Sequence, residues 1–130
     1  MKQINWYIGL FLIFIFIITG LYIQYLSIPE DAHPHVYRMI LRANHVYILF
    51  IGMVNIVLSR SNYTSPRIEW MSRVFYIISA PLVLLAFMWE TGGDMENRLI
   101  SFNAVLLAFM GLILFILDVI FYPKQPKADS

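Results

Sequence analysis

Cysteine is absent from this 130-residue sequence, and charged residues make up only 13% of it. Without cysteine the chain can form no disulfide, no thiolate nucleophile and no Cys-based zinc or iron–sulfur site. The net charge of +1 argues against a nucleic-acid partner, because nucleic-acid binding needs a strongly basic face. The sequence also lacks a Ser-His-Asp spacing, a Gly-rich phosphate loop and an HExxH motif. With no catalytic constellation in view, a non-enzymatic protein is favoured.

Hydrophobic residues, in contrast, account for 60% of the chain, whereas soluble domains average about 45–50%. They form four segments of about 20 residues, the length that crosses a bilayer as a helix. The predicted spans are residues 5–27, 36–59, 70–89 and 99–122, within one transmembrane domain over residues 1–130. Apolar character continues to Leu26, so we expect the first segment to be an uncleaved span and not a signal peptide. The expected fold class is an all-α, integral membrane, antiparallel four-helix bundle.

Lysine and arginine are distributed unevenly between the two sides of such a bundle. With the N-terminus inside, six basic residues face the cytoplasm: Lys2, Arg60, Arg67, Arg73, Lys124 and Lys127. Three lie on the other side: Arg38, Arg42 and Arg98. Because cytoplasmic loops are enriched in Lys and Arg, both termini are predicted to be cytoplasmic. In a bacterium this would be the inner membrane.

Each span carries one stripe of small or polar residues at helical spacing, which predicts the faces that pack together. The four stripes are Gly9, Ile13, Gly20 and Gln24; Arg38, Arg42, His45, Leu49, Gly52 and Ile56; Ser72, Tyr76, Ser79, Val83, Ala86 and Glu90; and Asn103, Leu107, Gly111, Leu114 and Asp118. Asn44 and Asn55 share nearly the same angle on a different face of the second span. That face is a candidate for oligomer formation.

Polar residues from all four spans are expected near the non-cytoplasmic face of the bundle. They are Gln24, Arg38, Arg42, His45, Glu90 and Asn103. Ionisable groups cost about 2.5–3.5 kcal/mol each inside a bilayer, so they usually turn inward and carry a partner. We therefore predict an ion pair between Arg42 and Glu90. The layer could be a pocket for an anionic or polar ligand, or a hydrogen-bond lock that sets the helix register.

Three histidines raise the question of a metal or haem. His33 and His35 flank a proline beside two acidic residues, and His45 follows ten residues later, so these three could bind a divalent metal. Only His45 lies inside a span, so a bis-histidine haem would need a second subunit or a loop ligand. The lone acid near the other face, Asp118, is expected to pair with Arg60, Arg67 or Arg73.

Two functional hypotheses follow from these observations. The first is a small non-catalytic multi-pass protein, an accessory or binding module that acts through helix packing. Its partners would be membrane lipid and a homo-oligomer or a larger membrane complex. The alternative is a ligand-, haem- or metal-binding subunit that uses Arg42, His45, Glu90 and Asn103.

Overall fold

The computed structural model describes residues 1–26, 35–90 and 98–121. They form four α-helices: α1 (Lys2–Leu21), α2 (His35–Arg60), α3 (Pro66–Trp89) and α4 (Leu99–Phe121). A single π-helical turn, η1 (Tyr22–Leu26), extends α1. Each helix is long and apolar enough to cross a membrane. At about 1.5 Å per residue, 23 or 24 residues exceed the roughly 30 Å hydrocarbon thickness. The chain is therefore a multi-pass membrane protein.

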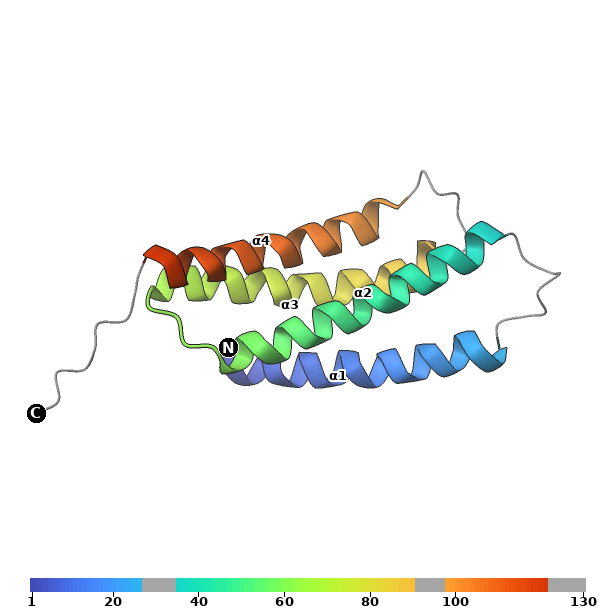
Figure 1. The fold of residues 1–130 in the computed structure, drawn as a ribbon. Helices are drawn as coiled ribbons and strands as arrows, with labels where there is room; N and C mark the ends of the chain where they lie inside the picture. The colour runs from blue at the N-terminus through green and yellow to red at the C-terminus, as the bar shows by residue number, and fades with distance from the viewer. Residues whose placement is uncertain (27–34, 91–97, 122–130) are drawn as a thin grey trace, which may run out of the picture.

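The helices form two hairpins that meet along their inner helices (Figure 1). α1 packs mainly on α2, α4 packs mainly on α3, and α2 contacts α3 between them. Successive helices run in opposite directions, so the predicted antiparallel four-helix fold is confirmed. We call the end with Lys2, Arg60, Pro66 and Phe121 the proximal end. The end with Leu26, His35, Trp89 and Leu99 is the distal end.

The helical segments, with η1 included, agree with the predicted spans to within three residues except at the start of α3. The sequence predicts this span from Trp70, whereas the helix begins at Pro66. Proline suits the first turn of a helix, because its fixed φ fits and its missing N–H would have no helical partner there. Ser65 precedes it but makes no side-chain cap. A residue from another helix takes that role, as described below.

Small residues allow the helices of each hairpin to approach closely. Gly9 of α1 lies against Gly52 of α2, where an added Cβ on Gly9 would come within 2.9 Å of the Gly52 carbonyl oxygen. On the other hairpin, Gly111 of α4 faces the ring of Tyr76, and a Cβ there would come within 2.6 Å of it. Lipid is as apolar as leucine, so such close packing is a main source of helix association in membranes.

The predicted inward stripe of α3 is confirmed in full. All its members are buried: Ser72, Tyr76, Ser79, Val83, Ala86 and Glu90. On α4 the buried face is formed by Ser101, Ala104, Ala108, Gly111 and Asp118. It includes part of the predicted stripe but not Asn103, which is exposed. α4 therefore sits on α3 through its smallest residues.

Candidate functional site

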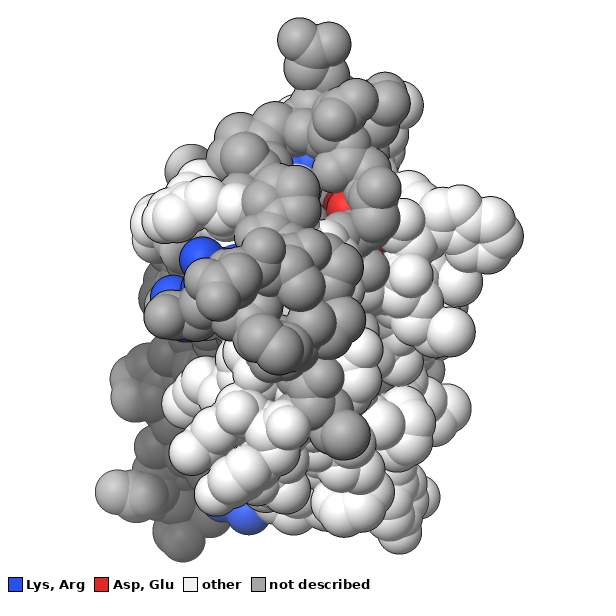
Figure 2. Space-filling view, turned by 90° about the vertical axis from the view of Figure 1, so that its right-hand side faces the viewer, with Lys and Arg blue, Asp and Glu red and all other residues white. Residues whose placement is uncertain are grey.

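The predicted polar layer of the distal end is only partly assembled. Gln24 and Arg42 are exposed, and Asn103 is exposed with its amide donating to the Leu99 carbonyl of its own helix at 2.6 Å. His45 is half-buried and Glu90 is buried. Figure 2 looks onto this end and shows blue Lys and Arg atoms at the left, apart from the red carboxylate atoms, and further blue atoms close to the red ones near the top. None of these residues lines either of the two grooves described below.

Glu90 accepts hydrogen bonds from the start of α4 and not from Arg42. Its Oε1 accepts the backbone N–H of Ile100 at 2.6 Å, and both of its oxygens lie within 3.2 Å of the N–H of Ser101. The predicted Arg42–Glu90 ion pair is therefore wrong. The first N–H groups of a helix have no helical acceptor and carry partial positive charge, so a carboxylate satisfies both requirements.

Asp118 makes the matching contact at the proximal end. Its two oxygens accept the N–H of Thr64 at 2.7 Å and of Ser65 at 2.8 Å, just before α3 begins. Asp118 was expected to pair with Arg60, Arg67 or Arg73. In the structure its partners are these backbone N–H groups instead. The last turn of α3 caps α4 through Glu90, and the last turn of α4 caps the entry to α3 through Asp118. These reciprocal caps lock the register of the second hairpin.

Asn44 joins three helices at the distal end. It lies on α2, donates to the Ala86 carbonyl of α3 at 3.1 Å, and accepts from Arg98 Nη2 at 2.8 Å. The Arg98 guanidinium also lies 5.9 Å from the centre of the Tyr47 ring. Sequence reasoning missed Arg98 as a site residue. The sequence feature that could have identified Arg98 is its position directly before the fourth apolar segment.

The proposed oligomer face of α2 is wrong, because Asn44 and Asn55 are both fully buried inside the chain. Asn55 accepts a hydrogen bond from the Asn5 amide at 2.9 Å, and its own amide donates to the Ile51 carbonyl. Both asparagines therefore connect helices within one copy.

His45 lies in the contact between α1 and α2. Its ring stacks on Phe16 with centroids 4.0 Å apart, and its Nδ1 is 2.9 Å from Thr19 Oγ1. Thr19 Oγ1 also lies within hydrogen-bond distance of the Ile15 and Phe16 carbonyl oxygens. The Thr19–His45 contact can form with either atom as the donor, depending on the tautomer of the imidazole. A Cβ on Gly20 would lie 3.4 Å from Nε2, so glycine leaves this edge of the ring uncrowded.

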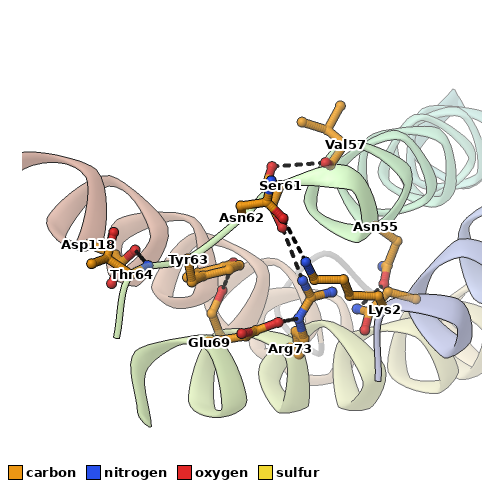
Figure 3. A network of polar contacts seen from close by, with 12 residues as sticks. Lys2, Asn55, Val57, Ser61, Asn62, Tyr63, Thr64, Glu69, Arg73 and Asp118 are labelled. Atoms are coloured by element: carbon orange, nitrogen blue, oxygen red, sulfur yellow. Dashed lines mark hydrogen bonds and ion pairs between the residues drawn. The ribbon is translucent and has the colours of Figure 1, made fainter. Parts of the chain in front are cut away.

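The proximal end holds a polar network around Arg73 (Figure 3). Arg73 is fully buried, and its Nε donates to Glu69 Oε1 at 2.9 Å while Nη2 donates to the Ser61 carbonyl. Lys2 donates to Asn62 beside it. The hydroxyl groups of Tyr63 and Ser72 share a hydrogen bond of 2.8 Å, and Ser72 Oγ also lies 2.8 Å from the Gly111 carbonyl oxygen. Burial raises the pKa of Tyr63, although its bond to Ser72 acts in the opposite direction. Loop and helices are thus joined by side-chain contacts.

Among the described residues, two grooves open on the sides of the distal half. One, of about 370 Å³, lies among α1, η1, α2 and α3 and is lined by Ile18, Thr19, Tyr22, Tyr37, Leu41, Phe87 and Met88. The other, of about 180 Å³, lies between α2 and α4 and is lined by Tyr47, Arg98, Ser101, Phe102 and Val105. Only the second has a charged residue in its wall.

The predicted metal residues are placed as follows. His33 lies outside the described residues, His35 is exposed at the start of α2, and His45 lies in the same helix. At about 1.5 Å per residue, ten residues separate His35 from His45 by about 15 Å, so an ion at His45 would need other ligands. Within residues 1–26, 35–90 and 98–121, no three His, Asp or Glu side chains gather as a metal site would require.

Comparison with known proteins finds no matching family model, no matching curated protein and no matching solved structure.

Proposed function

We propose that this chain is a non-catalytic multi-pass membrane protein, an accessory or binding module that works through helix packing. The observation that supports this most is how its buried polar side chains are used. Five of them bond to another helix or to the segment before it: Asn5 to Asn55, Thr19 to His45, Asn44 to Ala86, Tyr76 to Ala108 and Asp118 to Ser65. Hydrogen bonds between helices fix the positions of the helices relative to one another. The outer helix faces then remain available for association with other membrane proteins.

The outer faces of α1 and α4 are the surfaces proposed for that association. Both helices lie at the outside of the two hairpins, and their outward residues are large and apolar, including Phe11, Phe14 and Ile113. Larger membrane assemblies or further copies of this chain would pack there. In their absence lipid covers the same faces.

Site-specific crosslinking tests this proposal. A diazirine analogue of leucine would replace either Leu10 on α1 or Leu106 on α4, both exposed, in the chain expressed in its own membrane. The expected result is a discrete protein adduct from at least one of these positions. Leu12, which is fully buried, provides the matched control and should crosslink only within the chain. Lipid adducts alone at both outward positions would contradict the packing role.

The proposed orientation has both termini in the cytoplasm, in the inner membrane if the host is bacterial. The support is the excess of basic residues at the proximal end, where the described residues include Lys2, Arg60, Arg67 and Arg73. The chain has no native thiol to compete with a label. A cysteine at Asp94 should react with an impermeant reagent from outside, and one at Asn62 should not. The reverse pattern would invert the topology.

A second candidate function is a ligand-, haem- or metal-binding subunit, now centred on His45. The observation in its favour is the His45 imidazole inside the bundle with its Nε2 edge beside Gly20, because imidazole nitrogen is a common metal and haem ligand. The other members of the predicted set contribute less, since Glu90 and Asn103 bond to backbone groups. A haem would need a second axial ligand, which another copy of the chain could supply.

Absorption spectroscopy and metal analysis of the detergent-purified chain test this candidate. A Soret band or stoichiometric metal in the wild type, lost in His45→Ala and retained in His35→Ala, would favour it. A colourless, metal-free wild-type sample purified under mild conditions would exclude both cofactor versions and leave the packing module.

A further inference from the structure

The groove between α2 and α4 at the distal end combines one positive charge with apolar walls. Its volume is about 180 Å³, and among the described residues that line it Arg98 is the only charged one. The other lining residues are Tyr47 of α2 and Ser101, Phe102 and Val105 of α4. A groove of this kind favours a molecule with an anionic group and a hydrocarbon part.

The guanidinium of Arg98 is held in place but is not fully satisfied. Nη2 donates to Asn44, and the ring of Tyr47 lies near the guanidinium carbon. Nε, in contrast, is buried and has no hydrogen-bond acceptor. A buried charged donor without an acceptor is costly, and an anion bound beside the guanidinium would offset part of that cost through charge attraction. Phosphate is a strong acceptor for the donors of a guanidinium.

The residues of the α4 wall are ordered along the membrane normal. Arg98, Ser101, Phe102 and Val105 are spaced as i, i+3, i+4 and i+7, so they follow one face of the helix. Arg98 directly precedes Leu99, where α4 begins, which places the charge at headgroup depth. Phe102 and Val105 lie about one and two turns deeper. The positive charge therefore lies at the depth of the lipid phosphate, and the apolar wall lies at the depth of the acyl chains.

We propose that this groove binds an anionic phospholipid, with the phosphate at Arg98 and an acyl chain along Phe102 and Val105. Glu90 occupies the N–H groups of Ile100 and Ser101, so the guanidinium, not the helix N-terminus, is the anion partner. Farther along the same helices, Phe50 and Phe109 stand with ring centroids 5.7 Å apart. These rings bridge α2 and α4 below the groove. The proposal adds a specific lipid contact to the packing role and does not depend on any protein partner.

Native mass spectrometry of the purified chain in detergent tests this site. Phosphatidylglycerol and phosphatidylcholine with identical acyl chains are titrated into wild type, Arg98→Gln and Arg42→Gln. Wild type should retain one phosphatidylglycerol per chain in preference to phosphatidylcholine. Arg98→Gln should weaken phosphatidylglycerol binding by about tenfold, as loss of a charge-assisted hydrogen bond implies. Arg42→Gln removes an exposed arginine from the same end and should bind like wild type.

Two further measurements keep the test decisive. Val105→Phe fills the groove without touching the Arg98–Asn44 bond, and it should lower lipid retention by a similar factor even if Arg98→Gln does not fold. Inorganic phosphate added in excess should not displace the lipid, because it cannot use the apolar wall. Equal binding by Arg98→Gln and Arg42→Gln, equal binding of the two lipids, unchanged retention in Val105→Phe, or displacement by phosphate would each overturn the proposal.

Discussion

Replacing Gly9 by alanine should force α1 away from α2. The added Cβ would meet Ile56 Cγ1 at 2.6 Å, the Gly52 carbonyl oxygen at 2.9 Å and the Ile56 backbone nitrogen at 3.0 Å. Two of these three atoms belong to the backbone, so a side-chain rotation cannot relieve the contact. The helix itself has to move.

The size of the effect follows from this displacement. To lengthen the 2.9 Å approach to an ordinary contact of 3.4 Å, α1 must move outward by about 0.5 Å. Such a gap removes about a quarter of the dispersion energy of each atom pair, so about 20–40 pairs worth about 0.1–0.2 kcal/mol each lose about 0.5–2 kcal/mol together. The Asn5–Asn55 bond lies one turn away, and interhelical bonds of this kind average about 0.6 kcal/mol. A total of about 1–3 kcal/mol agrees with the typical cost of overpacking.

Gly20→Ala is the matched control, because it lies in the same helix and gains the same alanine. The alanine favours the helix by up to about 1 kcal/mol over glycine at either position. At Gly20, however, the nearest atom is Cε1 of the His45 side chain at 3.2 Å, and no backbone atom of α2 lies within the contact distance. The difference between the two variants isolates the clash from the helix propensity.

Reversible unfolding of both variants in mixed micelles, or by steric trapping in bicelles, provides the measurement. Gly9→Ala should have an unfolding free energy about 1–3 kcal/mol below that of Gly20→Ala. Equal stabilities would refute the reasoning, since they would mean that the α1–α2 crossing is not as close as the Gly9–Gly52 geometry requires.

Two other predictions concern the polar contacts between helices. Asn5→Ala and Asn55→Ala should each destabilise the chain, with a coupling in the double mutant of about 0.6 kcal/mol and no more than about 1.7 kcal/mol, and strictly additive losses would show that the two amides do not meet. Asp118→Asn should lower the unfolding free energy by about 1–3 kcal/mol, because Thr64 N–H or Ser65 N–H then faces an amide NH₂, whereas Asn62→Ala removes only an exposed bond from Lys2 and should cost less. A smaller loss in Asp118→Asn than in Asn62→Ala, measured by the same unfolding assay, would argue against the cap.

The α3 stripe shows what could be predicted well from the sequence. Ser72, Tyr76, Ser79 and Ala86 repeat at helical spacing among larger apolar residues, and small or polar residues avoid lipid more than leucine does. The pattern therefore identifies the buried face without knowledge of the neighbours. The spans were predictable for a similar reason, since hydropathy is a local sum over about 20 residues.

The polar layer shows where this reasoning fails. Counting along the spans places Gln24, Arg42, Glu90 and Asn103 at a similar depth, but depth does not determine which way each side chain points. Asn103 is exposed and bonds within its own helix. Glu90 accepts hydrogen bonds from the first N–H groups of α4 and not from Arg42. For Asn44 and Asn55 the shared angle was right and the direction was wrong, because the face turns inward.

The amino-acid sequence by itself determined the number of helices, their lengths and the inner face of α3, because these depend on the hydropathy and spacing of residues near one another in the chain. Only the tertiary structure decided the polar partners: Asn5 with Asn55, Glu90 with the start of α4, Asp118 with the entry to α3, and Arg98 with Asn44. Each of these contacts joins two segments of the chain, so it depends on how the helices are rotated and how closely they approach. Those quantities are set by the fit of whole helix surfaces, above all at Gly9, Gly52 and Gly111.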